Sequence, residues 1–229
     1  FARVGLDGKW GFINQKGQPI TGQWYDWVMD FRGDFAQVKL NGKWNFINQK
    51  GQPITGQWYD VLGDFNEGFA VVRLDGKWNF INQKGQLISD QWYDDVLDFY
   101  QGFARVGLDG KWGFINQKGQ LISDQWYDYV WNFHEGFAQV KLDGQWRFIN
   151  QEGQPINNQW YDWVCNFYGG FAEVKLNGKY YKLDKNGRLH NINENKGYKN
   201  MKQRIRLSES DLHRMIKESV KQVLSELEW

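Results

Sequence analysis

The sequence predicts an all-β tandem array, an open and twisted stack of three-stranded units, followed by a C-terminal amphipathic α-helix. A segment of 34 residues recurs, with copies that begin at Phe1, Phe35, Phe69, Phe103 and Phe137 and a shortened sixth copy from Phe171. Apolar and polar residues alternate within each copy, which is the period of a β-strand. A fixed period of this length indicates a stack of one small unit, with function spread over the copies.

Each copy begins with a predicted β-hairpin, illustrated by the second copy. The run FAQVKL has the two-residue period of a strand, Asn41 and Gly42 follow as a turn that needs positive φ, and KWNFIN returns as the second strand. On such a turn, the aliphatic residues of the first strand share one face, and the Trp and Phe of the second strand share the other. Both faces carry apolar residues, so the neighbouring unit must cover at least one of them.

The segment QWYDxVxxF is predicted as a shorter third strand. Gly51 and a proline in three copies (Pro19, Pro53 and Pro155) interrupt any helical continuation, and β-branched and aromatic residues dominate the remainder. These features exclude the helix pairs of tetratricopeptide repeats, which share the 34-residue period. A full unit at the start and an extra hairpin after the fifth copy favour an open stack over a closed propeller.

The repeat resembles the bacterial WG repeat over residues 1–188. The shared elements are Gly, Lys or Gln, and Trp in succession, then Phe-Ile-Asn, a Gly five residues after the Phe, a Tyr-Asp pair, and Gly or Asp before Phe-Ala. The eponymous glycine is replaced in three copies, by Asn45, Asn79 and Arg147. The resemblance implies an interaction module without general enzymatic activity. A weaker resemblance to the aromatic hairpins of choline-binding and glucan-binding repeats implies a carbohydrate or choline ligand.

Composition narrows the classes of function. The chain has 229 residues, of which 18% are aromatic, so it can bury a large apolar area. A net charge of +1 gives no global field for nucleic acid or an anionic membrane, and no apolar run is long enough for a transmembrane helix. The histidines and Cys165 have no recurring catalytic partner, and no phosphate loop or zinc spacing occurs. We therefore expect no enzymatic activity and no cofactor.

Positions that do not vary among the copies are interpreted as scaffold. The Trp10 series and the Trp24-Tyr25 pairs are expected in the core, because a unit of this size has few other large side chains to bury. The alternative is a row of indoles that stacks on sugar rings. Asn14 and Asp26 recur as well, and we expect them to cap turns by accepting hydrogen bonds from backbone N–H groups. A metal site on the Asp26 series is the alternative, although one carboxylate per unit is too few oxygens for calcium.

Positions that vary are interpreted as the recognition surface, because repeat arrays keep the scaffold and change the surface. They cluster in the third strand and the loop after it, where aromatic residues of one copy correspond to Asp, Gly or Asn in another. The candidate contact residues are Trp27, Tyr100, Tyr129, Trp131, Trp163 and Tyr168. The alternative is neutral drift on a solvated rim. We expect a non-enzymatic scaffold that binds a protein or other macromolecule, with a carbohydrate-binding module as the alternative function.

The C-terminal part departs from the repeat. Residues 189–207 are predicted as a basic linker, whose cations lack the interleaved aromatic residues that would indicate nucleic-acid binding. Residues 208–229 are predicted as an amphipathic helix that begins at a capping pair, Ser208 and Asp211. Its apolar stripe fits three roles: capping the end of the array, docking to a partner or self-associating, and lying on a membrane. The shortage of bulky aromatic residues argues against the membrane.

Overall fold

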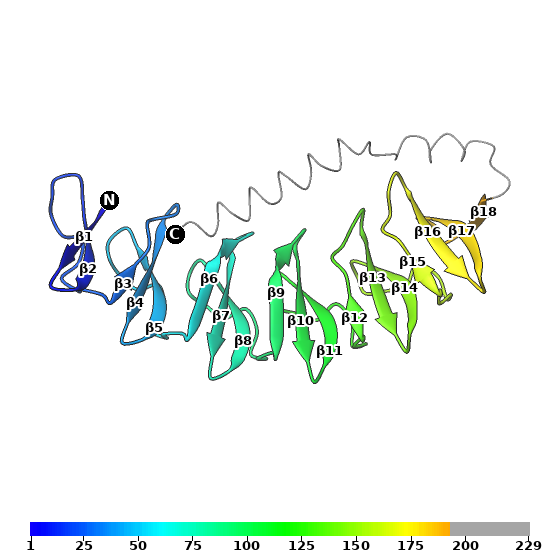
Figure 1. Ribbon diagram of the computed structural model, residues 1–229, viewed down its shortest axis with the longest axis horizontal. Helices are drawn as coiled ribbons and strands as arrows, with labels where there is room; N and C mark the ends of the chain where they lie inside the picture. Colours follow the sequence, from blue (N-terminus) through cyan, green and yellow to red (C-terminus); the bar gives the residue numbers. More distant parts are fainter. Residues whose placement is uncertain (193–229) are drawn as a thin grey trace.

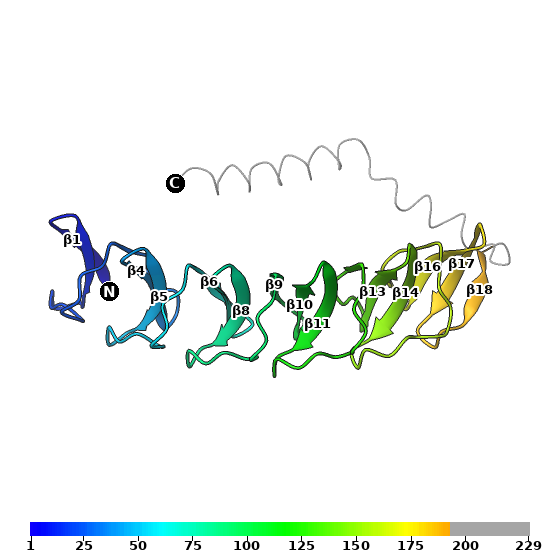
Figure 2. The same ribbon diagram turned by 90° about the horizontal axis from the view of Figure 1, so that it is seen from below.

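The protein is a row of antiparallel β-sheets, seen in a computed structural model that describes residues 1–192. The sheets stand side by side along a gently curved row, and the first hairpin and the last sheet lie at opposite ends (Figures 1 and 2). The predicted all-β array with an open arrangement is therefore confirmed. The predicted amphipathic helix and nearly all of the predicted linker lie outside the described residues. Among residues 1–192, no helix is long and apolar enough to cross a membrane.

The first hairpin consists of β1 (Ala2–Leu6) and β2 (Lys9–Ile13), and five larger sheets follow. Their strands are β3 (Trp27–Val28), β4 (Phe35–Leu40) and β5 (Lys43–Asn48); β6 (Val61–Asn66), β7 (Phe69–Leu74) and β8 (Lys77–Asn82); β9 (Asp95–Tyr100), β10 (Phe103–Leu108) and β11 (Lys111–Asn116); β12 (Tyr129–Val130), β13 (Phe137–Leu142) and β14 (Gln145–Asn150); β15 (Trp163–Val164), β16 (Phe171–Leu176), β17 (Lys179–Asp184) and β18 (Leu189–Asn191). β18 includes the first residues of the segment predicted as a linker.

The third segment of each copy is divided between two sheets. Tyr25 exchanges two backbone hydrogen bonds of 2.8 Å with Trp10 of its own copy. Only three residues later, Val28 pairs with Val38 of the next copy, so β3 belongs to the sheet that the next hairpin forms. The three-stranded sheet is therefore out of phase with the sequence repeat, and each connecting segment is hydrogen-bonded to two successive sheets.

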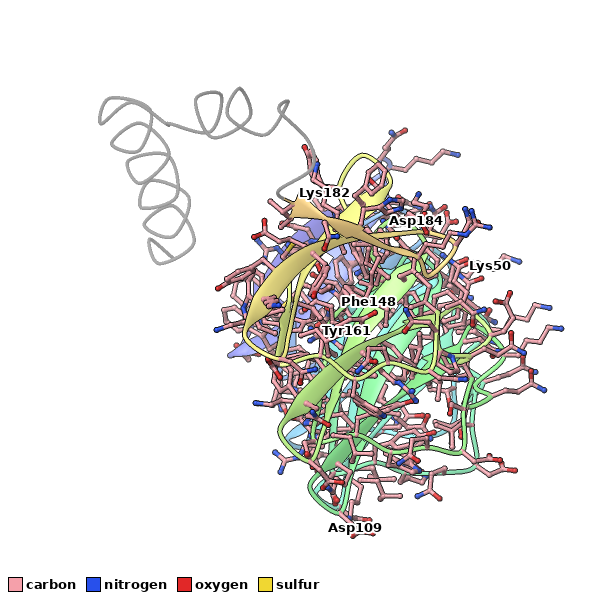
Figure 3. The ribbon with its side chains drawn as sticks, turned by 90° about the vertical axis from the view of Figure 1, so that its right-hand side faces the viewer. Lys50, Asp109, Phe148, Tyr161, Lys182 and Asp184 are labelled. Carbon is pink, nitrogen blue, oxygen red and sulfur yellow. The ribbon has the colours of Figure 1, made fainter. Side chains whose placement is uncertain are left out.

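The core lies between successive sheets. In the second sheet, Val38 and Ile47 lie on the face toward the first hairpin, where they pack with Phe12 and Tyr25 of the preceding copy. All four side chains are at most 2% exposed, and the same arrangement recurs at the following junctions. Viewed along the row, the equivalent Phe148 and Tyr161 lie in the interior, whereas Lys50 and Asp109 lie at the periphery (Figure 3). Neighbouring copies thus shield each other's apolar faces.

A second set of phenylalanines packs between successive sheets. The ring centroid of Phe133 lies 4.5 Å from that of Phe103 and 4.9 Å from that of Phe114, and Phe133 is 1% exposed. Corresponding contacts recur in the other copies, with Phe31, Phe65, Phe99 and Phe167 in the central position. Aromatic pairs at such separations stabilise a core beyond the burial of their area.

The recurring polar residues cap turns, as predicted. The Asn14 side-chain oxygen accepts hydrogen bonds from the backbone N–H groups of Lys16 (2.9 Å) and Gln18 (3.0 Å). Asp60 forms an ion pair with Lys43 of its own copy, and its other oxygen accepts a hydrogen bond of 2.9 Å from the Asp75 N–H in the next hairpin turn. This second contact joins one copy to the next, which explains why the carboxylate recurs.

The last sheet differs on its outward face. Lys182 occupies the position that Phe148 holds in the preceding copy. The outer edge of β17 pairs with β18, in which Leu189 lies opposite Leu183. The charged Lys182 on the terminal face and the covered edge oppose end-to-end association of strands. The three roles considered for the predicted C-terminal helix stay predictions, because that segment lies outside the described residues.

Candidate functional site

All six candidate contact residues are exposed, from 41% for Tyr129 to 83% for Tyr168. The predicted exposure is therefore confirmed, whereas their role in binding stays a prediction. They lie at two opposite ends of the strands. Tyr100 and Tyr168 lie beside the turn between the first and second strands of their sheets, where they pair with Phe103 and Phe171. The others, Trp27, Tyr129, Trp131 and Trp163, lie toward the hairpin turn at the far end.

At the hairpin end, one face of the second sheet carries a row of three side chains. Trp27 pairs with Lys39, and Lys39 pairs with Trp44 on the third strand. Residues directly opposite each other in antiparallel strands project from the same face, so the lysine stem lies between the two indoles. The Lys39 Nζ atom is 5.3 Å from the centroid of the Trp44 ring, close enough for a cation–π interaction.

This row belongs to an open groove of about 680 Å³, the first groove. It is lined by Asp26, Trp27, Met29, Lys39, Gly42 and Trp44. The second groove, of about 530 Å³, lies three repeat periods further along the chain and is lined by the equivalent residues Asp128, Tyr129, Trp131, Lys141, Gly144 and Trp146. The fold thus builds the same kind of groove twice, with different aromatic side chains.

The aromatic rings are arranged differently in the two grooves. In the second groove, the Tyr129 ring centroid lies 5.5 Å from that of Trp131 and 6.4 Å from that of Trp146. In the first groove, Trp27 contacts Trp10 of the preceding hairpin, at 5.9 Å and an interplanar angle of 64°. In both grooves the variable aromatic residues remain more than 40% exposed, so their rings are available to a ligand.

The carboxylate in each groove is already engaged. Asp26 forms an ion pair with Lys9, and a hydrogen bond from Lys9 together with backbone N–H groups of the next turn lowers the pKa of Asp26. Asp128 is paired with Lys111 in the same way, and the hydrogen bond from Lys111 is the main cause of its lowered pKa.

The other three of the five larger sheets carry different rows. Trp163, Lys175 and Tyr180 form a third aromatic row with a central lysine, whose Nζ is 5.5 Å from the Tyr180 ring. The equivalent positions are Val61, Arg73 and Trp78 at one junction, and Asp95, Gly107 and Trp112 at another. The grooves are therefore not identical along the array.

Sequence reasoning missed the lysines and misplaced part of the tryptophan series. Trp44 and Trp146 were expected in the core but are only half-buried, because one side packs on the core while the other lines a groove. Lys39 and Lys141 were not candidates. The hairpin register, which places Lys39 opposite Trp44, was the signal that could have identified them.

No cluster suited to a metal ion is found within residues 1–192, where no group of three or more His, Cys, Asp or Glu side chains is gathered for that purpose. The carboxylates of the Asp26 series instead contact lysines and turn N–H groups, as described above.

Comparison with known proteins identifies the repeat. The family model described as WG containing repeat matches residues 10–44, 46–78, 80–112, 112–146 and 146–180. No curated protein matches the chain in sequence. Among solved structures, the chain is similar to Kluyveromyces lactis Hsv2 with loop 6CD replaced by a Gly-Ser linker, with 14% identity, coverage of 68% of this chain and 61% of that chain, and a TM-score of 0.37.

Two further solved structures are similar at comparable levels. BamB from Moraxella catarrhalis is 12% identical, with coverage of 80% of this chain and 66% of that chain and a TM-score of 0.33. A protein of unknown function from Bacteroides caccae is 12% identical, with coverage of 82% and 90% and a TM-score of 0.28. The chain therefore spans 61% of the Hsv2 structure and 66% of the BamB structure that it matches.

Proposed function

Because the chain belongs to the WG containing repeat family, whose model matches it five times between residues 10 and 180, we propose that it is a non-enzymatic scaffold that binds a protein partner through aromatic side chains that vary among its copies. The observation that carries this proposal is the exposure of Trp27, Trp131 and Trp163, which are 47%, 47% and 43% exposed on a fold whose invariant residues form the core and the caps.

The scaffold does not require these aromatic residues. The position of Trp131 is occupied by Met29, Gly63, Leu97 and Cys165 in the other copies. Since sheets with such different side chains stack in the same way, packing does not account for an indole at this position. Exposed Trp and Tyr are enriched among the residues that contribute most to protein interfaces.

A carbohydrate ligand is the second candidate. The rings of Tyr129 and Trp146 lie 6.4 Å apart at the edge of an open groove that also contains Lys141 and Asp128. Flat aromatic faces beside hydrogen-bonding groups also suit the apolar face and hydroxyl rim of a sugar.

The test compares three forms of the full chain. The first is the wild type, and the second carries Trp27→Ala, Tyr129→Ala, Trp131→Ala and Trp163→Ala. The third is a matched control that carries Gln15→Ala, Gln83→Ala, Gln117→Ala and Gln151→Ala in exposed loops. Proteins retained from a lysate of the source organism are quantified by mass spectrometry, and a glycan array is probed in parallel.

We expect a partner that the wild type and the control retain and that the aromatic variant loses. Retention of the same proteins by all three forms would contradict the proposal. Glycan binding that is lost only in the aromatic variant would support the carbohydrate candidate instead.

A further inference from the structure

In each groove a lysine ammonium lies between aromatic side chains, and this arrangement indicates the chemistry of the ligand. Resting on the proposed function, we infer that the first and second grooves each bind a protein segment in which a carboxylate side chain is flanked by large apolar side chains. The grooves supply aromatic surface through Trp27, Trp44, Tyr129 and Trp146, and they supply one central ammonium each, from Lys39 and Lys141.

Lys39 is placed to meet an anion from outside. Its aliphatic stem is held between Trp27 and Trp44 by the strand register, and its Nζ lies 5.3 Å from the Trp44 ring centroid. Contact with the indole orients the ammonium and leaves its outer side accessible. In the second groove, Lys141 lies in the same way, with its Nζ 5.4 Å from the Trp146 ring centroid. An ion contact made against an aromatic wall is stronger than one in bulk water, because the wall excludes solvent.

The resident carboxylates do not take this role. Asp26 is paired with Lys9 and Asp128 with Lys111, and Asp128 also accepts a hydrogen bond of 2.8 Å from the Asp143 N–H. A ligand carboxylate therefore meets Lys39 or Lys141 as the principal charge. The turn beside the first groove carries the neutral Asn41, whereas Asp143 lies in the turn beside the second. The first groove should bind the anionic segment more tightly.

In four of the five larger sheets, the aromatic residue at the head of the row and the lysine opposite it are either both present or both absent, and in the remaining sheet Arg73 lies opposite Val61. Lysine lies opposite each aromatic residue at the head of a row, as in the pairs Trp27 with Lys39, Tyr129 with Lys141, and Trp163 with Lys175. The junction that has Asp95 in place of the aromatic residue has Gly107 in place of the lysine. An anionic ligand would be repelled by Asp95, so this junction lacks both the attraction and the stacking surface. The three sheets that have an aromatic residue opposite a lysine therefore offer both groups to one ligand.

The test uses two blocked pentapeptides, acetyl-Phe-Ser-Glu-Ser-Phe-amide and its Gln counterpart, with the full chain. Alternate side chains of an extended peptide share a face, so the two Phe rings and the central side chain are presented together. Binding is followed by NMR through the indole N–H signals of Trp44 and Trp146. Glucuronate and glucose are titrated in parallel. We expect the Glu peptide to bind about two- to fivefold more tightly than the Gln peptide, with a preference that weakens at high salt.

Matched variants assign the preference to the grooves. The double substitution Lys39→Gln and Lys141→Gln should remove the preference for the Glu peptide. The control, Lys50→Gln and Lys118→Gln, removes the same charge from exposed loops and should retain it. Equal binding of the two peptides by the wild type, or a preference that persists in the groove variant, would overturn the inference. So would shifts of the same signals by glucuronate without shifts by either peptide.

A further variant tests whether an aromatic residue and a lysine, introduced into a sheet that lacks both, create a new binding site. Gly107 lies in a regular strand, and a Cβ at this position would meet Asp95 at 3.5 Å and Trp112 at 3.6 Å, which are ordinary contacts. The double substitution Asp95→Trp and Gly107→Lys should therefore create a third responsive indole at Trp112. If the aromatic variant still loses its protein partner while no peptide preference is found, this inference fails and the proposed function survives.

Discussion

Gly119 lies directly against the backbone of Ile88 in the preceding copy. A Cβ on Gly119 would lie 1.8 Å from the Ile88 carbonyl oxygen, and its φ is +73°. The loop glycines of the neighbouring copies, Gly51, Gly85 and Gly153, would place a Cβ 2.2 to 2.8 Å from the corresponding carbonyl oxygen. Close approach between copies, as well as the turn itself, therefore requires glycine in this loop. Gly17 in the first copy has the same φ, +74°, but a Cβ there would meet nothing within 4 Å.

We predict that Gly119→Ala destabilises the array considerably more than Gly17→Ala. Both substitutions place an L-residue in the left-handed region, at a cost of about 1–2 kcal/mol. Gly119→Ala adds a clash with the backbone, which cannot be relieved by a rotamer change and should cost at least about 2 kcal/mol more. Urea unfolding measures both values. Equal destabilisation by the two variants would show that the copies are not stacked in this way.

A second pair of variants compares a buried core residue, Phe133, with an exposed residue two positions before it, Trp131. Phe133→Ala removes a ring that is 1% exposed and packs between two other Phe rings, so we expect a loss of about 3–5 kcal/mol in the free energy of unfolding. Trp131→Ala removes a larger side chain that is 47% exposed, and its effect should stay within about 0.5 kcal/mol. Thermal and urea unfolding of both variants give the comparison, which would fail if Trp131→Ala were the more damaging change.

Asn45 stands where the first copy has the glycine of its Trp-Gly pair, and its side chain forms hydrogen bonds in the core. It is fully buried, its amide donates hydrogen bonds to the carbonyl oxygens of Thr55 (2.9 Å) and Gln57 (3.1 Å), and its oxygen accepts one from the Phe46 N–H (2.8 Å). In the first copy, the space above Gly11 is instead occupied by the ring of Trp24. Asn79 makes the same three hydrogen bonds in the next copy, so both Asn copies remain compatible with the fold. Arg147, in the fifth copy, instead lies over the Trp160 ring, 4.1 Å from its centroid.

Asn45→Asp should therefore destabilise the protein by about 3 kcal/mol or more. The substitution removes the donor from two buried carbonyl groups and places a carboxylate against them. Asn41→Asp makes the same chemical change at an exposed turn where four other copies already have Asp. The control should be close to neutral in urea unfolding. A stable Asn45→Asp variant would contradict the hydrogen-bond assignment.

The Asp–Lys pairs predict a loss of stability in acid. A hydrogen bond from Lys43 is the main cause of the lowered pKa of Asp60, and the Asp75 N–H contributes as well. Because the pKa of the folded state is below the unfolded value of about 3.9, the ionised carboxylate stabilises the protein above about pH 4. This contribution is lost as the pH falls through the pKa of the folded state.

Asp60→Asn should lower stability at pH 7 and make the decline below pH 4 shallower, so that the variant and the wild type converge once the pH is below the pKa of Asp60 in the folded state. Urea midpoints measured between pH 2 and 7 test this expectation. Asp124→Asn, a change in an exposed loop, should leave the profile of the wild type unchanged. Parallel profiles for the wild type and Asp60→Asn would show that the ion pair does not contribute.

Much of the fold could be predicted from the sequence because each copy contains the alternation and the turn residues that are typical of a β-hairpin. Alternation in FAQVKL and the Asn41-Gly42 turn predict the hairpin, and the hairpin register predicts the two faces correctly. The division of the third segment between two sheets could not be predicted. Trp24, Tyr25 and Val28 are suitable for a strand throughout, and the change of partner after Tyr25 depends on how two separate hairpins are placed in space.

The candidate site was predictable only in part. Variation among the copies correctly indicated which aromatic residues are exposed, since a position that accepts Gly63 and Trp131 cannot be a tightly packed one. The same criterion did not identify the outer side of Trp44, because an invariant residue can serve the core on one side and a groove on the other. Lys39 was missed although its position varies, with Arg73 and Gly107 in the next two copies, because only the third strand and the loop after it were considered as the recognition surface. Nor did variation among the copies show that Tyr100 and Tyr168 lie at the opposite end of the strands from the grooves.

The central claim is that neighbouring copies shield the invariant Tyr and Phe rings of the core and leave the variable aromatic residues in solvent. The most direct measurement is hydroxyl-radical footprinting of the full chain, with the modification rate of each aromatic residue resolved by mass spectrometry. We predict fast modification of Trp27, Trp131 and Trp163 and slow modification of Phe133 and of Tyr25 and its equivalents, which are buried. Equal rates at Trp131 and Phe133, or faster modification of the Tyr25 series than of Trp27, Trp131 and Trp163, would contradict the claim.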